Sequence, residues 1–396
     1  MMTAKQTNKR LVVVMIDPLT PIIKKGEIVE RYHNPGELFD EIHFVLLNDD
    51  KPDPVKLQPL AGRARVFVHN APMPSQMVVR TMGWRPRLVR RFVDPVVALI
   101  ATIAPDVTRA LNPWLDGFVC AEAKRLHGIP YVISLHANPD LDYRGQKKPE
   151  GGVRGFVNYH ALPALERDVI SGAETVVCVY KYILPYAKRL GARSAVLAYN
   201  VVATSKIVPK TDYALGAPPR LLMLGRQLRQ KDPSPVIRAL ASIPGLHADI
   251  IGTGPIHEGL KTLAGEVGVA DRIQFRTSIQ NSEICSRMRD YDIMVSVNDY
   301  GGVSKVELES ATAGLPIVTN LHPFEDEPEV LGQSCIGVSG TDQSYTDALE
   351  KLLGDESLRR RLGEGVRQNV ADLDGDRMEM QLRDVYLDAL GKRVTA

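Results

Sequence analysis

The chain is poor in cysteine, and its cysteines are scattered. Its 396 residues include four of them, Cys120, Cys178, Cys285 and Cys335, and none forms a Cys-x-x-Cys pair. This spacing argues against a disulfide framework and against a cysteine zinc site, and it fits a reducing compartment. We expect all four to be small buried apolar residues.

Long apolar runs and net charge are lacking as well. Leu11–Ile16 is too short for the core of a signal peptide, and Val96–Ala104 is far below the roughly 20 residues of a membrane-spanning helix. We therefore expect a cytoplasmic protein. The 49 Lys and Arg nearly balance the 47 Asp and Glu, which leaves a net charge of +2 and no global attraction to nucleic acid. An anionic partner must therefore be held by a local cluster.

Short β-branched runs alternate with amphipathic stretches along the chain. The strands predicted from them are Leu11–Ile16, Ile42–Leu46, Ala64–His69, Tyr131–Leu135, Thr175–Val179, Val196–Tyr199, Arg220–Leu224, Ala248–Ile251, Ile273–Arg276, Ile293–Val297, Pro316–Thr319 and Ser334–Val338. The segment after Pro105-Asp106-Val107 is either a short strand or a loop. Strands separated by helices predict right-handed crossovers and doubly wound parallel sheets, an α/β fold.

These strands are too many for one sheet of normal width, and a polar stretch divides them. Val202–Pro219 has no hydrophobic period and is typical of an interdomain linker. We predict two Rossmann-like domains facing a cleft, residues 1–205 and 219–376, joined by a linker at 206–218. The last segment, 377–396, carries a helical pattern that we expect to cross back onto the first domain. Ligands of such sheets bind beyond the carboxyl ends of the strands.

A candidate phosphate site follows the strand ending at Leu224. Gly225 permits a tight turn, and Arg226 and Lys231 stand on the loop that leads to a helix near Pro235. Two cations beside a helix N-terminus suit a diphosphate, because the helix dipole and the free amides add to their charge. On this spacing alone, two solvated surface cations are the simpler interpretation.

Two further segments place glycine turns after strands. The strand ending at Ile251 runs into Gly252-Thr253-Gly254-Pro255, where glycines let a ligand or a backbone approach closely. The strand ending at Val297 leads through Gly301-Gly302 into a helix that carries Glu309 and is followed by Gly314-Leu315-Pro316. The glycine loop is a second candidate anion site, and Glu309 can accept hydrogen bonds from a ribose diol.

The order and spacing of these motifs over residues 220–320 resemble the donor-binding half of family-4 retaining glycosyltransferases with the GT-B fold. The resemblance implies that Arg226 and Lys231 neutralise the donor diphosphate and stabilise the leaving group, that Glu309 holds the ribose and that Arg276 lies near the base. The other implied donor-binding residues are Gly225, Gly254, Gly302, Val303 and Ser304. Neither a metal nor another cofactor is expected, because the cations and amides supply the electrostatic stabilisation.

One position departs from the family pattern. The family usually has a first glutamate eight positions before the second, and here that position is Gly301, which has no side chain. Asp299, two residues upstream, is the candidate replacement. Lys305 and Glu307 also stand where the family is mostly apolar. The identity of the donor sugar therefore stays open.

The first domain resembles the family more loosely. His136 follows Gly-Ile-Pro and a strand. In the family, a histidine that follows the same pattern lies near the sugar. The alternative is a loop histidine whose hydrogen bonds are satisfied within the protein. Gly26, in Lys24-Lys25-Gly26-Glu27, is the counterpart of a family glycine loop and a candidate contact of the donor phosphates.

An arginine-rich segment, Arg80–Phe92, interleaves five arginines with Met, Trp, Leu, Val and Phe. Such a stretch can lie on an anionic membrane surface, where each basic residue adds about 1 kcal/mol. A solvated helix face with its apolar side packed inward is an equal alternative.

These observations predict a retaining GT-B glycosyltransferase that uses a nucleoside diphosphate sugar and a hydroxyl acceptor such as an envelope glycan, a glycolipid or another glycoconjugate. No nucleic-acid partner is expected. A binding protein without turnover is a second hypothesis, motivated by Gly301. A nucleotide-sugar epimerase is a third, but the sequence shows no paired acid–base motif for it.

Overall fold

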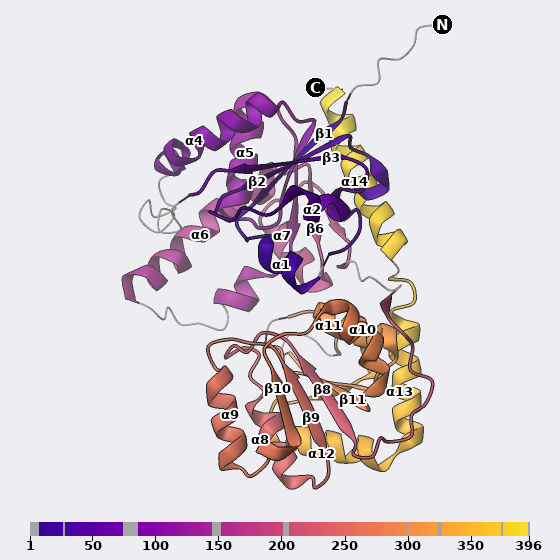
Figure 1. Ribbon diagram of the computed structural model, residues 1–396. Helices are drawn as coiled ribbons and strands as arrows, with labels where there is room; N and C mark the ends of the chain where they lie inside the picture. The colour runs from indigo at the N-terminus through magenta and orange to yellow at the C-terminus, as the bar shows by residue number, and fades with distance from the viewer. Residues whose placement is uncertain are drawn as a thin grey trace, which may run out of the picture. The chain divides into compact units, whose positions relative to one another are not determined.

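The protein is described by a computed structural model that covers residues 8–26, 28–73, 86–144, 152–200, 206–299, 301–322, 327–373 and 375–394. The chain divides into two compact units (Figure 1). Unit 1 combines Met1–Val201 with Asp376–Ala396, and unit 2 comprises Val202–Gly375. The chain therefore leaves unit 1 and returns to it.

Unit 1 contains a parallel sheet whose described strands follow the order β3-β2-β1-β4-β5-β6-β7. The strands are β1 (Arg10–Met15), β2 (Glu41–Leu46), β3 (Arg65–Asn70), β4 (Val107–Ala110), β5 (Tyr131–Leu135), β6 (Thr175–Cys178) and β7 (Ala195–Leu197). The helices are α1 (Thr20–Lys25), α2 (Pro54–Ala61), α4 (Pro86–Ile103), α5 (Leu115–His127), α6 (Gly152–Gly172), α7 (Leu184–Arg189) and α14 (Gly375–Val394). Strand β1 is a buried apolar run, and β5 is buried along its whole length, as in a sheet covered on both faces.

The strand β4 settles the one segment that the sequence left undecided. It lies between β1 and β5 in the sheet, although two of its four residues, Thr108 and Arg109, are polar. Arg109 is buried, and its guanidinium donates to the carbonyl of Tyr32, the hydroxyl of Tyr386 and the hydroxyl of Ser134. Because the hydrophobic run is interrupted by these side chains, pattern alone does not identify the strand.

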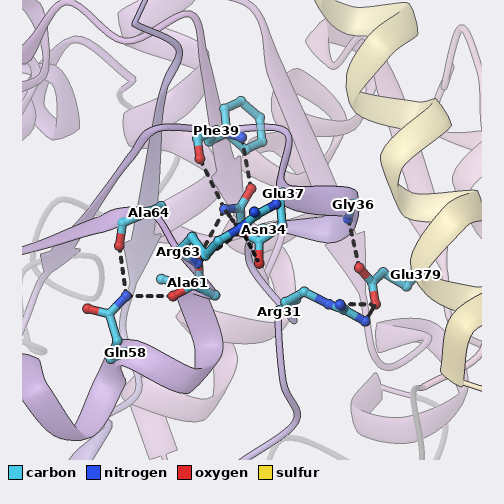
Figure 2. A network of polar contacts seen from close by, with 11 residues as sticks. Arg31, Asn34, Gly36, Glu37, Phe39, Gln58, Ala61, Arg63, Ala64 and Glu379 are labelled. Carbon is cyan, nitrogen blue, oxygen red and sulfur yellow. Dashed lines mark hydrogen bonds and ion pairs between the residues drawn. The ribbon is translucent and has the colours of Figure 1, made fainter.

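The C-terminal helix α14 is fastened to unit 1 by polar contacts at its start and apolar contacts further on. Figure 2 shows Glu379 of α14 reaching Arg31 and the backbone amide of Gly36; the Arg31 Nη2–Glu379 Oε2 distance is 2.8 Å and the Gly36 N–Glu379 Oε1 distance is 2.7 Å. Further along the helix, the buried Tyr386 ring packs edge-on against Phe39 at 5.2 Å between centroids. The helix thus completes the core of unit 1.

Unit 2 contains a second parallel sheet, with the described strands in the order β10-β9-β8-β11-β12-β13. The strands are β8 (Arg220–Leu224), β9 (His247–Ile251), β10 (Ile273–Arg276), β11 (Ile293–Ser296), β12 (Ile317–Asn320) and β13 (Ile336–Val338). The helices are α8 (Ser234–Ser242), α9 (His257–Glu266), α10 (Asn281–Arg287), α11 (Lys305–Ala313), α12 (Asp342–Gly354) and α13 (Glu356–Asn369). The strand order reverses between β8 and β11, which is the kind of point where open α/β sheets bind ligands.

The segment predicted as a linker, 206–218, is part of unit 2 and packs along it. Tyr213 is buried, and its hydroxyl donates to the carbonyl of Gly314 at 3.0 Å. Lys210 is buried as well and donates from Nζ to the carbonyl of Arg289 at 3.0 Å. Polar composition therefore did not mean solvent exposure here.

The predicted fold class is confirmed: two doubly wound parallel sheets, each with helices between its strands. Three of the four cysteines, Cys120, Cys178 and Cys285, are buried as expected, whereas Cys335 is partly exposed. None of the described helices combines the length and the apolar composition that crossing a bilayer requires.

Candidate active site

The candidate site of unit 2 begins where β8 ends. Gly225 and Arg226 follow Leu224 directly, and both are exposed at this edge of the sheet. The loop is held by backbone hydrogen bonds to the neighbouring turn after β9: Gly225 N donates to Ile251 O at 3.0 Å, and Gln227 N donates to Thr253 O at 3.1 Å. The strand and this pairing together fix where the Arg226 side chain starts.

The glycines of the turn after β9 are required by a close approach of two backbones. A Cβ at Gly252 would lie 1.8 Å from the carbonyl oxygen of Gly225, and one at Gly254 would lie 2.0 Å from that of Gln227. Gly252 also has φ +143°, a value that side chains disfavour. The sequence left open whether these glycines allow a ligand or another backbone segment to approach. In the structure they allow a backbone segment to approach.

The loop that carries Lys231 is also attached on its other side. Lys231 N donates to Leu228 O at 2.9 Å, which closes a turn, and Asp299 N donates to Gln230 O at 2.8 Å. Asp299 follows β11, so the loops after β8 and β11 are joined at the point where the strand order reverses. Lys231 is thereby brought beside the segment that leads to α11.

Lys231 lies in a partly desolvated position next to other charges. Burial lowers the pKa of its ammonium group, the Glu307 carboxylate acts in the opposite direction, and the Arg226 guanidinium lowers the pKa further. The Arg226 guanidinium is therefore near enough to Lys231 to act on it electrostatically, and the two cations can act on one anion. The predicted pair Arg226 and Lys231 is therefore brought together by the fold.

A glycine loop connects β11 with α11 and is held by two asparagines. Asn298 N donates to Asn320 Oδ1 at 2.7 Å, and Asn320 Nδ2 donates back to Asn298 O at 3.0 Å. Asn298 Nδ2 donates to Gly302 O at 3.3 Å, and Gly302 has φ +80°. Val303, which follows, is buried in unit 2. The loop is thus anchored on the adjacent strand β12.

The first turn of α11 is closed by a capping box. Ser304 Oγ accepts from Glu307 N at 3.2 Å, and Ser304 N donates to Glu307 Oε2 at 2.7 Å. Thr319 of β12 donates to the other carboxylate oxygen, Glu307 Oε1, at 2.9 Å. The Ser304 amide, predicted to meet the donor, is therefore engaged by Glu307 in this structure.

Glu309 is buried one turn further along α11, with a side-chain exposure of 3%. Asn281 Nδ2 donates to its Oε1 at 3.0 Å, and Lys305 Nζ lies 3.8 Å from the same oxygen. The carboxylate that the sequence assigned to a ribose diol is thus held in place from two sides.

Asp299, the candidate replacement for the missing first glutamate, lies at the junction of the two loops. Its Oδ1 accepts from Asn320 Nδ2 at 3.3 Å. Partial burial and the nearby Asp232 carboxylate raise the pKa of Asp299. A carboxyl group in such a place is a suitable hydrogen-bond partner for sugar hydroxyls, and its contact with a donor sugar stays a prediction.

The remaining predicted residues belong to other segments of the chain. Arg276 ends the edge strand β10, where its Nη2 donates to Gln274 Oε1 at 3.0 Å and its Nη1 lies 3.9 Å from Glu283 Oε1. His136 and Gly26 belong to unit 1. Gly26 ends α1 with φ +68°, and its amide donates to the carbonyl of Ile23 at 3.0 Å.

His136 follows β5 in unit 1 and lies near Arg109. Burial and the Arg109 charge lower the pKa of His136 to about 4, so its imidazole is neutral at pH 7. Its Nε2 is buried and has no hydrogen-bond partner within the described part of the chain. The histidine is therefore not a fully satisfied loop residue, and it can act as a hydrogen-bonding group without charge.

Sequence reasoning missed three residues that hold the site. Glu307 had a usable signal, because Ser304-x-x-Glu307 is a capping-box pattern before an apolar run. Asn281, on α10, had none. His257 also had none, and its Nδ1 lies 2.5 Å from Gln227 Oε1 behind the loop after β8. Among the described residues, no three His, Cys, Asp or Glu side chains are grouped as a metal site. Independence from metal stays a prediction.

Comparison with known families assigns both halves of the chain. Residues 28–200 match the family described as "Glycosyl transferase 4-like domain", and residues 212–369 match "Glycosyl transferases group 1".

Two relatives and one solved structure illustrate the similarity. The chain is 24% identical over 225 residues to the lipopolysaccharide core biosynthesis glycosyltransferase LpsE of Rhizobium meliloti, covering 56% of this chain and 65% of that protein. It is 29% identical over 235 residues to a GDP-mannose-dependent alpha-(1-6)-phosphatidylinositol monomannoside mannosyltransferase of Mycolicibacterium smegmatis, covering 53% and 61%. These matches thus span less than two thirds of either relative. Sucrose-phosphate synthase from Thermosynechococcus elongatus shares the fold, with a TM-score of 0.73, 15% identity and coverage of 97% and 100%.

The close backbone approach makes a testable prediction about Gly254. In Gly254→Ala, the new methyl group meets the Gln227 carbonyl, so we expect a loss of about 1–3 kcal/mol of stability, as in other overpacked sites. Amide hydrogen exchange should become faster in residues 225–233. Gly259→Ala is the matched control: it lies exposed in α9 with no described atom within 4 Å of its Cβ, and it should stabilise by about 0.5–1 kcal/mol. Equal stability of the two variants would contradict the close approach.

The neutral His136 makes a prediction about acid stability. The pKa of His136 in the folded protein lies below its ordinary value of 6.5, so on acidification the unfolded chain takes up a proton before the folded protein does. The contribution of this histidine to the free energy of unfolding is therefore present above pH 6.5 and is lost as the pH falls from 6.5 to about 4. His136→Asn should therefore lose less stability between pH 7 and pH 5 than the wild type. Both tryptophans, Trp84 and Trp114, belong to unit 1, so urea unfolding followed by their fluorescence reports on it. The exposed His127→Asn should behave like the wild type; the same behaviour in His136→Asn would rule out a depressed pKa.

Proposed function

This chain belongs to the family-4-like glycosyltransferases of the GT-B fold, and we propose that it transfers a sugar from a nucleoside diphosphate sugar to a hydroxyl acceptor with retention of the anomeric configuration. The observation that carries the proposal is the convergence of Arg226, Lys231 and the Glu309 helix where the strand order of unit 2 reverses. Arg226 and Lys231 suit the donor diphosphate and the negative charge that develops on it as the leaving group, and Glu309 suits the ribose diol.

The donor diphosphate takes the place beside Arg226 and Lys231. Lys231 is partly desolvated, so its charge is poorly stabilised by water and gains from an anionic partner. Fixed cations that face a leaving group stabilise the negative charge that develops on it. The amides of Gly302 and Val303 precede α11 and add backbone donors at the same edge.

The nucleoside is recognised by its ribose through Glu309. The carboxylate is buried and oriented by Asn281, so it presents a fixed acceptor to two adjacent hydroxyl groups. Arg276, at the end of β10, is the proposed contact near the base. Asp299 is the proposed partner of the sugar hydroxyls in place of the first family glutamate.

The reaction that fits this arrangement takes place on one face of the donor sugar. The bond between the anomeric carbon and the diphosphate oxygen breaks while the acceptor oxygen forms its bond to the same carbon from the same side. The departing diphosphate, stabilised by Arg226 and Lys231, takes the acceptor proton on its oxygen. The configuration is retained, and no side chain forms a covalent intermediate. Neutral His136 of unit 1 is the proposed polar contact of the transferred sugar.

The acceptor is proposed to be an envelope glycan, a glycolipid or another glycoconjugate. The names of the two relatives refer to a lipopolysaccharide core and to a phosphatidylinositol monomannoside. A peripheral membrane association through the segment Arg80–Phe92 accords with such acceptors. Its residues 80–85 lie outside the described residues; in α4, Arg91 is exposed and Phe92 is 46% exposed, whereas Arg90 pairs with Glu122 at 3.0 Å.

A thermal-shift screen against UDP, GDP, ADP, dTDP and their common sugars tests the donor site. A nucleotide at about 100 times its dissociation constant adds about 2.7 kcal/mol of stability. We expect one base to stabilise the wild type strongly and Lys231→Met or Glu309→Gln weakly. Lys261→Met, which removes an exposed lysine on α9, should respond like the wild type.

The donor identified in this screen then tests the reaction. Slow hydrolysis without acceptor, and a glycoside of unchanged configuration with acceptor, support a retaining transferase; product configuration is read by nuclear magnetic resonance. Tight binding without hydrolysis or transfer would instead indicate a binding protein, and interconversion of donor sugars an epimerase. No stabilisation by any nucleotide would refute the proposed donor site.

Sedimentation with vesicles tests the membrane proposal. The protein should co-sediment with vesicles that contain anionic phospholipid and not with purely zwitterionic ones, and salt should weaken the association. Arg91→Glu should reduce the bound fraction several-fold. The matched control is Arg167→Glu, because Arg167 is an exposed arginine on α6 of the same unit. Equal binding of both variants to anionic vesicles would show that α4 is not the contact.

A further inference from the structure

Lys305 and Glu309 form an ion pair inside the proposed donor site. They lie one helical turn apart on α11, with Lys305 Nζ 3.8 Å from Glu309 Oε1. The lysine side chain is 32% exposed and the glutamate 3%, so the pair reaches from solvent into the protein. Asn281 donates to the same carboxylate oxygen. Lys305 is therefore close to an atom that a ribose diol must use.

Lys305 also stands at an unfavourable place for a cation. It is the first residue of α11, where unpaired amides create a positive potential that favours anions and disfavours ammonium groups. Arg226 and Lys231 are placed at the same edge of the sheet, which adds to the positive charge there. In the absence of a ligand, Glu309 is the carboxylate that offsets the charge of Lys305.

Donor binding changes the partners of both residues. A ribose diol that donates two hydrogen bonds to the Glu309 carboxylate competes with Lys305 for Oε1. The lysine ammonium group sits on a flexible four-carbon stem and moves easily. A diphosphate bound at the start of α11 supplies a stronger anion than the carboxylate that Lys305 has left. Ribose and phosphate recognition are then linked through one side chain.

Resting on the proposed function, we propose that Lys305 exchanges its partner on donor binding, leaving Glu309 for the diphosphate and thereby making Glu309 available to the ribose. Lys305 is thus a third phosphate-binding cation of the site, in addition to Arg226 and Lys231. A nucleoside alone breaks the ion pair and provides no new anion. A nucleoside diphosphate breaks the pair and replaces it.

The difference between these two ligands is the test. For each ribonucleotide, affinities of the wild type and Lys305→Met are measured for the diphosphate and for the matching nucleoside: UDP and uridine, GDP and guanosine, ADP and adenosine. The diphosphate should bind Lys305→Met about tenfold more weakly, as expected for loss of one charge-assisted contact. The nucleoside should bind the variant more tightly, by up to about fivefold, because the partly exposed Lys305–Glu309 ion pair no longer competes with it.

Two further variants separate this exchange from a general effect on the site. Lys305→Arg keeps the charge and should retain diphosphate affinity within about threefold of the wild type, since arginine binds phosphate well. Lys261→Met removes another Lys–Glu pair, Lys261 Nζ–Glu258 Oε1 at 3.0 Å on α9, and should change neither affinity.

The outcomes are distinct. Unchanged diphosphate affinity in Lys305→Met, or equal weakening of diphosphate and nucleoside, overturns the exchange while the donor site itself stands. Absence of any nucleotide binding by the wild type removes the proposed function and the exchange with it. Weakening of the diphosphate without weakening of the nucleoside supports the exchange.

Discussion

Two loop backbones of unit 2 lie so close together that no side chain fits between them, and the candidate site depends on this contact. A Cβ at Gly252 or Gly254 would overlap the carbonyl groups of Gly225 or Gln227. Since protein interiors are packed to the density of organic crystals, the contact leaves the loop after β8 little freedom. The hydrogen bond from Asp299 N to Gln230 O fastens the same loop from the other side. These backbone contacts thus fix where the Arg226 and Lys231 side chains leave the loop.

The charges of the site are arranged in couples. Glu307 favours the charged form of Lys231, and Glu309 pairs with Lys305. Both glutamates have structural partners as well, Ser304 and Thr319 for Glu307 and Asn281 for Glu309. An uncompensated cluster of cations beside a helix N-terminus would repel itself and destabilise the unit. Internal acids remove this cost while leaving the cations at the edge where an anion can reach them.

The sequence predicted what local patterns encode. Buried apolar runs identified β8 and β11, the strands on both sides of the point where the sheet of unit 2 reverses. The loop after β8, with Gly225-Arg226 and Lys231, located two of the cations. The strand β4 stayed undecided because Thr108 and Arg109 interrupt its apolar run, and the partners of Arg109 come from residues 32, 134 and 386. The contacts of Asn281 with Glu309 and of Asn298 with Asn320 join segments about 20–30 residues apart. Single asparagines do not form a periodic sequence pattern, so the sequence could not predict these contacts. The pattern Ser304-x-x-Glu307 is typical of a capping box and could have predicted the role of Glu307. The sequence comparison with the family showed only that Glu307 stands where the family is mostly apolar.

The C-terminal helix affects the interior of unit 1, although it lies far from the rest of that unit along the chain. Tyr386 of α14 shares the buried Arg109 guanidinium with Tyr32 and Ser134. Burial and, to a smaller extent, the charge of that same guanidinium lower the pKa of His136 and keep its imidazole neutral. Because unit 1 includes residues from both ends of the chain, its core is incomplete until the helix after unit 2 has been made. A side chain 250 residues later than His136 thus contacts the guanidinium that helps to lower the pKa of the histidine. The buried Arg109 guanidinium thus takes part both in the docking of α14 and in the lowered pKa of the proposed sugar contact, His136.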